Sequence, residues 1–119
     1  MDLFNRLKDT SHEQVVFFRD QLAGLRAIVA IHSTALGPAI GGVKMSEDPS
    51  EAAAIEDALN LSRALTYKAA CAGVNFGGGY AIVMGDPKRH RTEALFRALG
   101  RFIDSLNGRY IAAEGSSEA

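Results

Sequence analysis

Residues 66–80, which read TYKAACAGVNFGGGY, combine side-chain types that could bind a small anion. Lys68 supplies a positive charge near the end of a predicted helix, and three glycines, Gly77, Gly78 and Gly79, follow in what the sequence predicts to be a loop. Glycine has no side chain, so the backbone amides of this loop could donate hydrogen bonds to a ligand. A cation beside exposed amides predicts a pocket for a carboxylate. A tight glycine turn beside a surface lysine is the alternative that these residues leave open.

Gly41 and Gly42 form a second glycine pair, inside a predicted strand over residues 39–44. Glycine weakens a strand, so its presence there often means that another group approaches the backbone closely. The pair is therefore a second candidate for contact with a ligand. A β-bulge at this point of the strand would explain the two glycines equally well.

The other residue types that can carry chemistry give weaker signals. His12, His32 and His90 are scattered along the chain without the spacing of metal ligands, so no metal site is expected. Cys71 stands in the stretch AACAG and is predicted to be a small buried side chain rather than a nucleophile. As the single cysteine it cannot form an internal disulfide, which suits a reducing compartment. The basic residues 88–91 are expected to be a solvated loop.

The composition is that of a globular protein forming one domain over residues 1–119. A net charge of -1 leaves no broad basic surface for phosphates, so nucleic acid is not an expected partner. The apolar runs are shorter than the roughly 20 residues that span a bilayer, and the N-terminus lacks the apolar core of a signal peptide. A cytoplasmic protein without a membrane partner is therefore expected.

The hydrophobic patterns predict an α/β fold with a mixed sheet. After a short amphipathic helix over residues 1–9, an antiparallel meander is expected, followed by strands joined through parallel β-α-β-α-β crossovers. The meander comprises strands 14–19, 25–31 and 39–44, and the crossovers comprise helix 51–72, strand 80–84, helix 92–106 and strand 109–113. The apolar run 80–84 lacks alternation, which is typical of a strand covered on both faces.

Several segments together resemble the N-terminal substrate-binding and dimerisation domain of leucine dehydrogenase, in the family of the glutamate, leucine, phenylalanine and valine dehydrogenases. These segments read IVAIHSTALGPAIGG, EAAAIEDALNLSRALTYKAA, GGG followed by AIVMGDP, and TEALFRALGRFIDSLNGRYIAAE. The resemblance implies an α/β domain with a mixed sheet, next to a separate Rossmann domain that binds NAD. It also implies a homo-oligomer.

The resemblance assigns roles to matching positions. Lys68 in TYKAA would grip the α-carboxylate of a substrate, helped by the backbone at Gly41 and Gly42. Leu36, in the segment LGPAI, would lie on the pocket wall beside an apolar substrate side chain. The expected partner is therefore a small α-amino or α-keto acid.

The chain also departs from the family pattern. Tyr80 stands where the family has a catalytic lysine, and Gly115 stands where it has a catalytic aspartate. A phenol with a pKa of about 10 is neutral at pH 7, so it can donate a proton but offers no positive charge. Tyr80 as acid and Glu114 as base are candidates, and the alternative for Glu114 is an exposed carboxylate at a strand end. The sequence ends before the family's nucleotide-binding half and lacks G-x-G-x-x-G, so no cofactor is expected.

The leading hypothesis is a stand-alone domain that binds a small α-amino or α-keto acid and has lost redox chemistry. Any reaction would then be cofactor-free acid–base, condensation or lyase chemistry. The alternatives are a non-catalytic oligomerisation or regulatory module, one half of a split NAD-dependent dehydrogenase, and a truncated or redesigned fragment.

Overall fold

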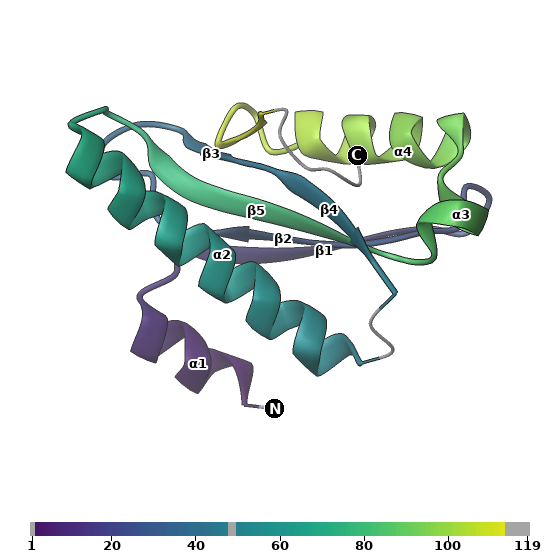
Figure 1. Ribbon diagram of the computed structural model, residues 1–119, viewed down its shortest axis with the longest axis horizontal. Helices are drawn as coiled ribbons and strands as arrows, with labels where there is room; N and C mark the ends of the chain where they lie inside the picture. The colour runs from purple at the N-terminus through teal and green to yellow at the C-terminus, as the bar shows by residue number, and fades with distance from the viewer. Residues whose placement is uncertain (1, 48–49, 114–119) are drawn as a thin grey trace.

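The computed structural model of the protein describes residues 2–47 and 50–113 (Figure 1). The elements in chain order are α1 (Leu3–Thr10), β1 (Gln14–Asp20), β2 (Leu25–Ile31), β3 (Ala39–Gly41), β4 (Val43–Ser46), α2 (Glu51–Ala72), β5 (Gly77–Met84), α3 (Pro87–His90), α4 (Glu93–Asp104) and β6 (Tyr110–Ala112). Within these described residues the strands form one mixed, six-stranded sheet with the order β1-β2-β5-β3-β6, and β4 also pairs with β5. The predicted α/β class is confirmed.

Strand β5 organises the sheet. It pairs antiparallel with β2 and parallel with both β3 and β4, while β1 and β2 form the predicted antiparallel hairpin. The third predicted meander strand differs from the expectation, because β5 lies between it and β2, and because Gly42 divides it into β3 and β4. Since β5 has neighbours on both edges and helices over both faces, its sequence is continuously apolar.

Helix α2 begins and ends at the residues that the sequence predicts. The Ser50 side chain accepts a hydrogen bond from the Ala53 amide, and Glu51 adds a negative charge in the first turn, where the helix dipole favours one. At the other end Gly73 adopts a left-handed conformation with φ of 74°, which stops the helix. The helix between these two ends is 22 residues long and packs mainly on β5, with further contacts to β2 and β3.

Helices cover the two faces of the sheet unequally, with α1 and α2 on one face and α4 on the other (Figure 1). The alternation of side chains along β2 sends Val29 and Ile31 toward α4, and Ile28 and Ala30 toward α2. A bidentate ion pair holds α1 against α2. The guanidinium of Arg6 in α1 donates to both carboxylate oxygens of Glu56 in α2, at 2.7 and 2.6 Å. The two faces thus have separate cores.

Three local details differ from the sequence-based predictions. Cys71 is exposed rather than buried, because its position on α2 faces away from the sheet. The basic run expected to be a loop contains a single helical turn, α3. The helix predicted over residues 92–106 is α4, which is shorter and uses Thr92 as its N-cap. Within the described residues, α2 and the other helices are too short or too polar to cross a membrane.

Candidate functional site

Helix α2 positions Lys68 at one end of the sheet. The helix ends at Ala72, and the Gly73 amide donates to the carbonyls of Ala69 and Ala70. Lys68 therefore lies one turn before the end of α2, rather than in its last turn as predicted. Its side chain is exposed and reaches the rim of a cleft between α2 and the first residues of β5.

This cleft has a volume of about 300 Å³ and mostly apolar walls. The residues that line it are Ile40, Leu65, Lys68, Ala69, Ala72, Val74, Phe76 and Gly77. All of them belong to the described part of the chain, and Lys68 alone among them carries a charge. Since no other described residue forms an ion pair with Lys68, its ammonium group is available to an anion. The pairing of one cation with apolar walls is typical of sites for small organic acids.

The glycine run corrects the expectation of a loop with exposed amides. Gly77, Gly78 and Gly79 are buried in β5. The Gly77 amide donates to the carbonyl of Pro38 at 3.0 Å, and the Gly78 amide donates to Oγ1 of Thr66 at 2.8 Å. These two amides are therefore occupied by oxygen atoms of the protein.

Close packing explains why these positions are glycine. A Cβ atom on Gly77 would lie 1.6 Å from the carbonyl oxygen of Ser33, and one on Gly78 would lie 2.0 Å from that of Ser62. Such distances are far shorter than any contact a real Cβ makes. The run lets α2 and the segment after β2 approach the strand closely, so its first role is in packing.

Gly41 and Gly42 sit where the chain passes from β3 to β4. A Cβ atom on Gly41 would lie 1.5 Å from the carbonyl oxygen of Gly79, so close strand packing excludes a side chain there. The carbonyl of Gly42 accepts hydrogen bonds from the Ala81 amide at 3.1 Å and from the Tyr110 hydroxyl at 2.6 Å. The pair thus interrupts the strand, in line with the alternative of a strand irregularity, and its contact with a ligand stays a prediction.

Tyr80 stands on the α2 side of β5 and is partly buried. Its ring end lies against Gly42, since a Cβ atom there would be 3.2 Å from the Tyr80 oxygen. The neighbouring Tyr110 phenol has a strongly raised pKa, chiefly because it is buried and secondarily because of Tyr80. Tyr80 does not line the Lys68 cleft, so the structure places the two predicted site residues near each other along the sheet but in separate surroundings.

Two further predicted residues lie apart from the cleft. Leu36 is 57% exposed in the segment between β2 and β3 and does not line the cleft. Gly37 beside it packs against the backbone of Asn75, which brings this segment close to the start of β5. Glu114 lies outside the described residues.

Behind the cleft, a buried polar network connects α1, β2, α2 and β5. Nδ1 of His32 lies 2.8 Å from Oγ1 of Thr66, and its Nε2 lies 2.9 Å from the carbonyl oxygen of Thr10. Because a carbonyl only accepts, Nε2 carries the proton, and Nδ1 accepts from the Thr66 hydroxyl. The same Thr66 oxygen accepts from the Gly78 amide. The turn of α2 just before Lys68 is thereby fixed to the sheet.

His12 completes this network. Its Nε2 lies 2.8 Å from Oγ of Ser62, which donates to the carbonyl of Ala58, and its Nδ1 lies 2.6 Å from Oγ1 of Thr10. The His12 and His32 rings meet edge to face at a centroid distance of 4.6 Å. Burial, and then the neighbouring His32, lower the pKa of His12 to about 4. His12 is therefore neutral at pH 7.

Little in the sequence indicates this network, because the two histidines are 20 positions apart and belong to different elements. One feature of the sequence could have predicted it. Ser62 and Thr66 are polar, and they lie one helical turn apart on the side of α2 that faces the sheet. Among the described residues, no group of three or more His, Cys, Asp or Glu side chains could hold a metal ion. The network is consequently a set of hydrogen bonds rather than a metal centre.

Comparison with known proteins identifies the class. Residues 12–116 match the model of a family described as Glu/Leu/Phe/Val dehydrogenase, dimerisation domain. The chain is 54% identical to leucine dehydrogenase from Bacillus cereus over 114 residues, which are 96% of this chain and 31% of that protein. It is 50% identical to phenylalanine dehydrogenase from Lysinibacillus sphaericus over 109 residues, 92% of this chain and 28% of that protein.

A solved structure agrees with these matches. L-tryptophan dehydrogenase from Nostoc punctiforme superposes with a TM-score of 0.92 at 46% identity, over 96% of this chain and 34% of that chain. The chain belongs to the Glu/Leu/Phe/Val dehydrogenase dimerisation-domain family, which confirms the resemblance seen in the sequence. It spans about a third of the length of the relatives it matches.

Proposed function

We propose that this domain binds the carboxylate of a small, apolar α-amino or α-keto acid in the cleft beside Lys68. The observation that carries the proposal is that Lys68 is the one charged residue among those that line an otherwise apolar cleft. A carboxylate would form a charge-assisted hydrogen bond with Lys68, and a hydrophobic side chain would lie against Val74 and Phe76. The names of its relatives, which include leucine, phenylalanine and tryptophan dehydrogenases, support an amino acid as the ligand.

We also propose that the domain does not support hydride transfer in the manner of these relatives. The support is Tyr80, which occupies the position of the family's catalytic lysine and offers no positive charge at neutral pH. Tyr80 could still donate a proton to a bound keto acid from the α2 side of the sheet. A cofactor-free acid–base reaction therefore remains part of the proposal, with Glu114 as the candidate base.

A homo-oligomer is the second candidate function, since the family is described as a dimerisation domain. Strand β1 supports it, because β1 is an outer strand of the described sheet and one side of its backbone is open to pairing. Light scattering at micromolar concentration tests this directly. A dimer or larger assembly is expected, and a monomer would contradict it.

Isothermal titration tests the binding proposal. L-leucine, L-phenylalanine and their α-keto acids are titrated into the wild-type chain, the Lys68→Ala variant and a Lys8→Ala control. Lys8 is also an exposed helical lysine and does not line the cleft, so the control makes the same change in net charge outside it. We expect wild-type binding that weakens about tenfold or more in Lys68→Ala, since a charge-assisted hydrogen bond contributes about 1.5–3 kcal/mol.

The Lys8→Ala control should bind as the wild type does. Equal affinity in Lys68→Ala and the wild type, or no binding of any of the four acids, would contradict the proposal. Restoring the lysine with Tyr80→Lys, with a nucleotide-binding partner and NAD supplied, tests the loss of hydride transfer. NAD-dependent turnover by the wild-type chain, with the same partner and NAD supplied, would contradict the proposed loss of hydride transfer.

A further inference from the structure

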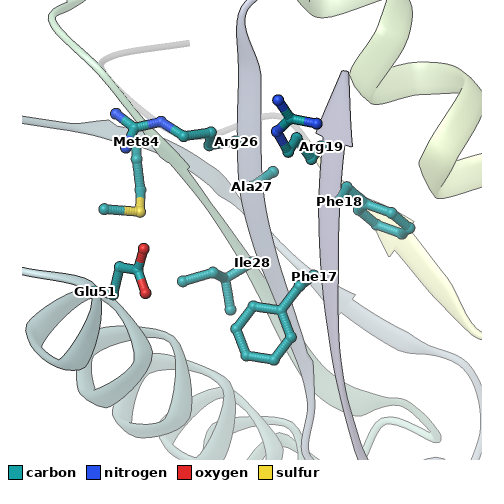
Figure 2. Close-up of a pocket in the computed structure, with 8 residues that line it drawn as sticks. All are labelled: Phe17, Phe18, Arg19, Arg26, Ala27, Ile28, Glu51 and Met84. Atoms are coloured by element: carbon teal, nitrogen blue, oxygen red, sulfur yellow. The ribbon is translucent and has the colours of Figure 1, made fainter. Parts of the chain in front are cut away.

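A second cleft lies at the opposite end of α2, on the same face of the sheet (Figure 2). It has a volume of about 180 Å³ and is formed by β1, β2, the end of β5 and the first turn of α2. Glu51, in that first turn, is 17 residues before Lys68, so at 1.5 Å per residue about 25 Å of helix separates the two clefts. None of the residues that line the Lys68 cleft contributes to this second one.

Two arginines stand side by side on this face. Arg19 of β1 and Arg26 of β2 are direct partners in the antiparallel register, so their side chains leave the same face about 5 Å apart. Like charges directly opposite each other destabilise a sheet. Within the described residues neither guanidinium forms a hydrogen bond or an ion pair. Carboxylates do pair with four other arginines, namely Arg6, Arg97, Arg101 and Arg109.

A pair of guanidinium groups with no partner in the described part of the chain favours an anion, because each presents planar N–H groups that match a carboxylate. The cost of placing the two charges together would be offset when such an anion binds. Arg19 and Arg26 are both exposed, so a ligand can reach them from solvent. The pair is therefore the charged part of a candidate site.

The rest of the cleft limits what kind of anion fits. Ile28 and Met84 are buried and Phe17 is 54% exposed, and together they give the cleft an apolar wall. Figure 2 shows the Glu51 carboxylate across Met84 from the Arg26 guanidinium, with the Arg19 guanidinium farther away. A carboxylate at that position disfavours a multiply charged anion such as phosphate and favours a ligand that also carries an ammonium group.

We propose that this cleft binds a free, apolar α-amino acid at a second site, with its carboxylate on Arg19 and Arg26, its ammonium group on Glu51 and its side chain against Phe17, Ile28 and Met84. The cleft volume suits a ligand smaller than a typical drug molecule. The inference does not depend on the proposed function, since it uses none of the residues of the Lys68 cleft.

The test uses amide chemical shifts of the full chain, measured by NMR in the Lys68→Ala background so that the first cleft is disabled. L-leucine is expected to shift the amide signals of residues 17–19, 26–28 and 51. The Arg19→Gln/Arg26→Gln double variant should weaken this binding at least tenfold. An Arg63→Gln/Arg91→Gln control, which makes the same change in net charge away from the cleft, should leave it unchanged.

Ligand analogues sharpen the test. Leucinamide, which lacks the carboxylate, should bind at least tenfold more weakly than L-leucine. Glu51→Gln should weaken the binding of L-leucine but not the binding of N-acetyl-leucine, which has no ammonium group. This single substitution on the surface keeps the proposal testable even where the double variant unfolds.

Four outcomes would overturn the proposal. L-leucine could fail to shift these amides, or could shift them equally in the arginine double variant. Inorganic phosphate could bind as tightly with the same dependence on the arginines, which would make the cleft a general anion site. The same amides could shift with protein concentration in the absence of ligand, which would mean that a second copy of the chain covers the cleft. If no ligand binds at the Lys68 cleft but L-leucine still binds at this second cleft, the proposed function fails and this inference stands.

Discussion

The two ends of the sheet face under α2 are built in opposite ways. At the C-terminal end of the helix, Gly78 lies so close to α2 that no side chain fits, and His12 and His32 are fully hydrogen-bonded. At the N-terminal end, Arg19 and Arg26 project from the same face, and neither guanidinium has a hydrogen-bond or ion-pair partner in residues 2–47 or 50–113 (Figure 2). The contact between α2 and the sheet therefore decides whether this face of the sheet carries glycines and paired polar side chains or exposed charged ones.

The difference has a physical reason. Where α2 touches the sheet, water is excluded, and each buried polar group must find a partner or lose about 1–3 kcal/mol. Where the helix begins, water reaches the face, so charged side chains remain there at low cost. The closed end is therefore structural support for the helix that carries Lys68, and the open end is where we propose the second ligand site.

The largest effect should come from adding one carbon at the closed end. In Gly78→Ala, the new Cβ atom would lie 2.0 Å from the carbonyl oxygen of Ser62 and 2.5 Å from the Thr66 amide nitrogen. Both atoms belong to the backbone of α2, so the helix itself must shift. We expect the free energy of unfolding to fall by about 3 kcal/mol, measured by chemical denaturation.

Gly100→Ala is the matched control. Gly100 lies in α4, and a Cβ atom there would have no neighbour within 4 Å. Alanine is the better helix former, so the control should raise the free energy of unfolding by about 0.7 kcal/mol. Equal changes in the two variants would show that α2 does not approach β5 so closely.

Acid should weaken the closed end next. The pKa of His12 is about 4 in the folded chain and 6.5 in the unfolded one, so between these values the unfolded chain takes up a proton that the folded chain does not. Stability at pH 7 is therefore lost as the pH falls through this window, by up to about 3 kcal/mol at pH 4, since each unit of difference between the two pKa values corresponds to about 1.4 kcal/mol. Urea denaturation at pH 7, 5.5 and 4 measures the loss.

A His12→Gln variant isolates this contribution. Glutamine does not titrate, so the variant is expected to be less stable at pH 7 but to lose less stability on acidification. A wild-type pH dependence in the variant would mean that His12 is not the group responsible.

The smallest effect is expected at the open end. Arg19→Gln removes the repulsion between Arg19 and Arg26, so the free energy of unfolding should rise by about 0.3 kcal/mol. Arg101→Gln, which removes the partner of Asp20, should lower it by a similar amount. Both are read from thermal denaturation at low salt, where surface charges are least screened. A loss of stability in Arg19→Gln would indicate that Arg19 has a structural partner.

Much of the fold could be predicted from local patterns. The bounds of α2 followed from Ser50 and Gly73, and the β1–β2 hairpin followed from two apolar runs around a short connection. The insertion of β5 between β2 and β3 could not be predicted. Local sequence patterns indicate that a segment is a strand, but they do not indicate which distant strand it pairs with. The prediction for Cys71 was wrong for a related reason, since a small apolar neighbourhood does not say which side of a helix faces the sheet.

The candidate site was predictable in part. Lys68 was found from its type and position, and it does border a cleft. The glycine run was selected because glycine marks a close approach to the backbone. Glycine does not say what approaches, however, and here the neighbour is the protein's own backbone. The second cleft was missed because Arg19 and Arg26 have no informative spacing along the chain until β1 and β2 pair.

The sequence by itself determined most of the elements, the helix that carries Lys68 and the family, because caps, periodicity and long motifs act over neighbouring residues. Only the tertiary structure decided which polar side chains are paired and which are free. Pairing depends on distances of a few ångströms between segments far apart in the chain, and those distances exist only once the sheet has formed and α2 has packed across it.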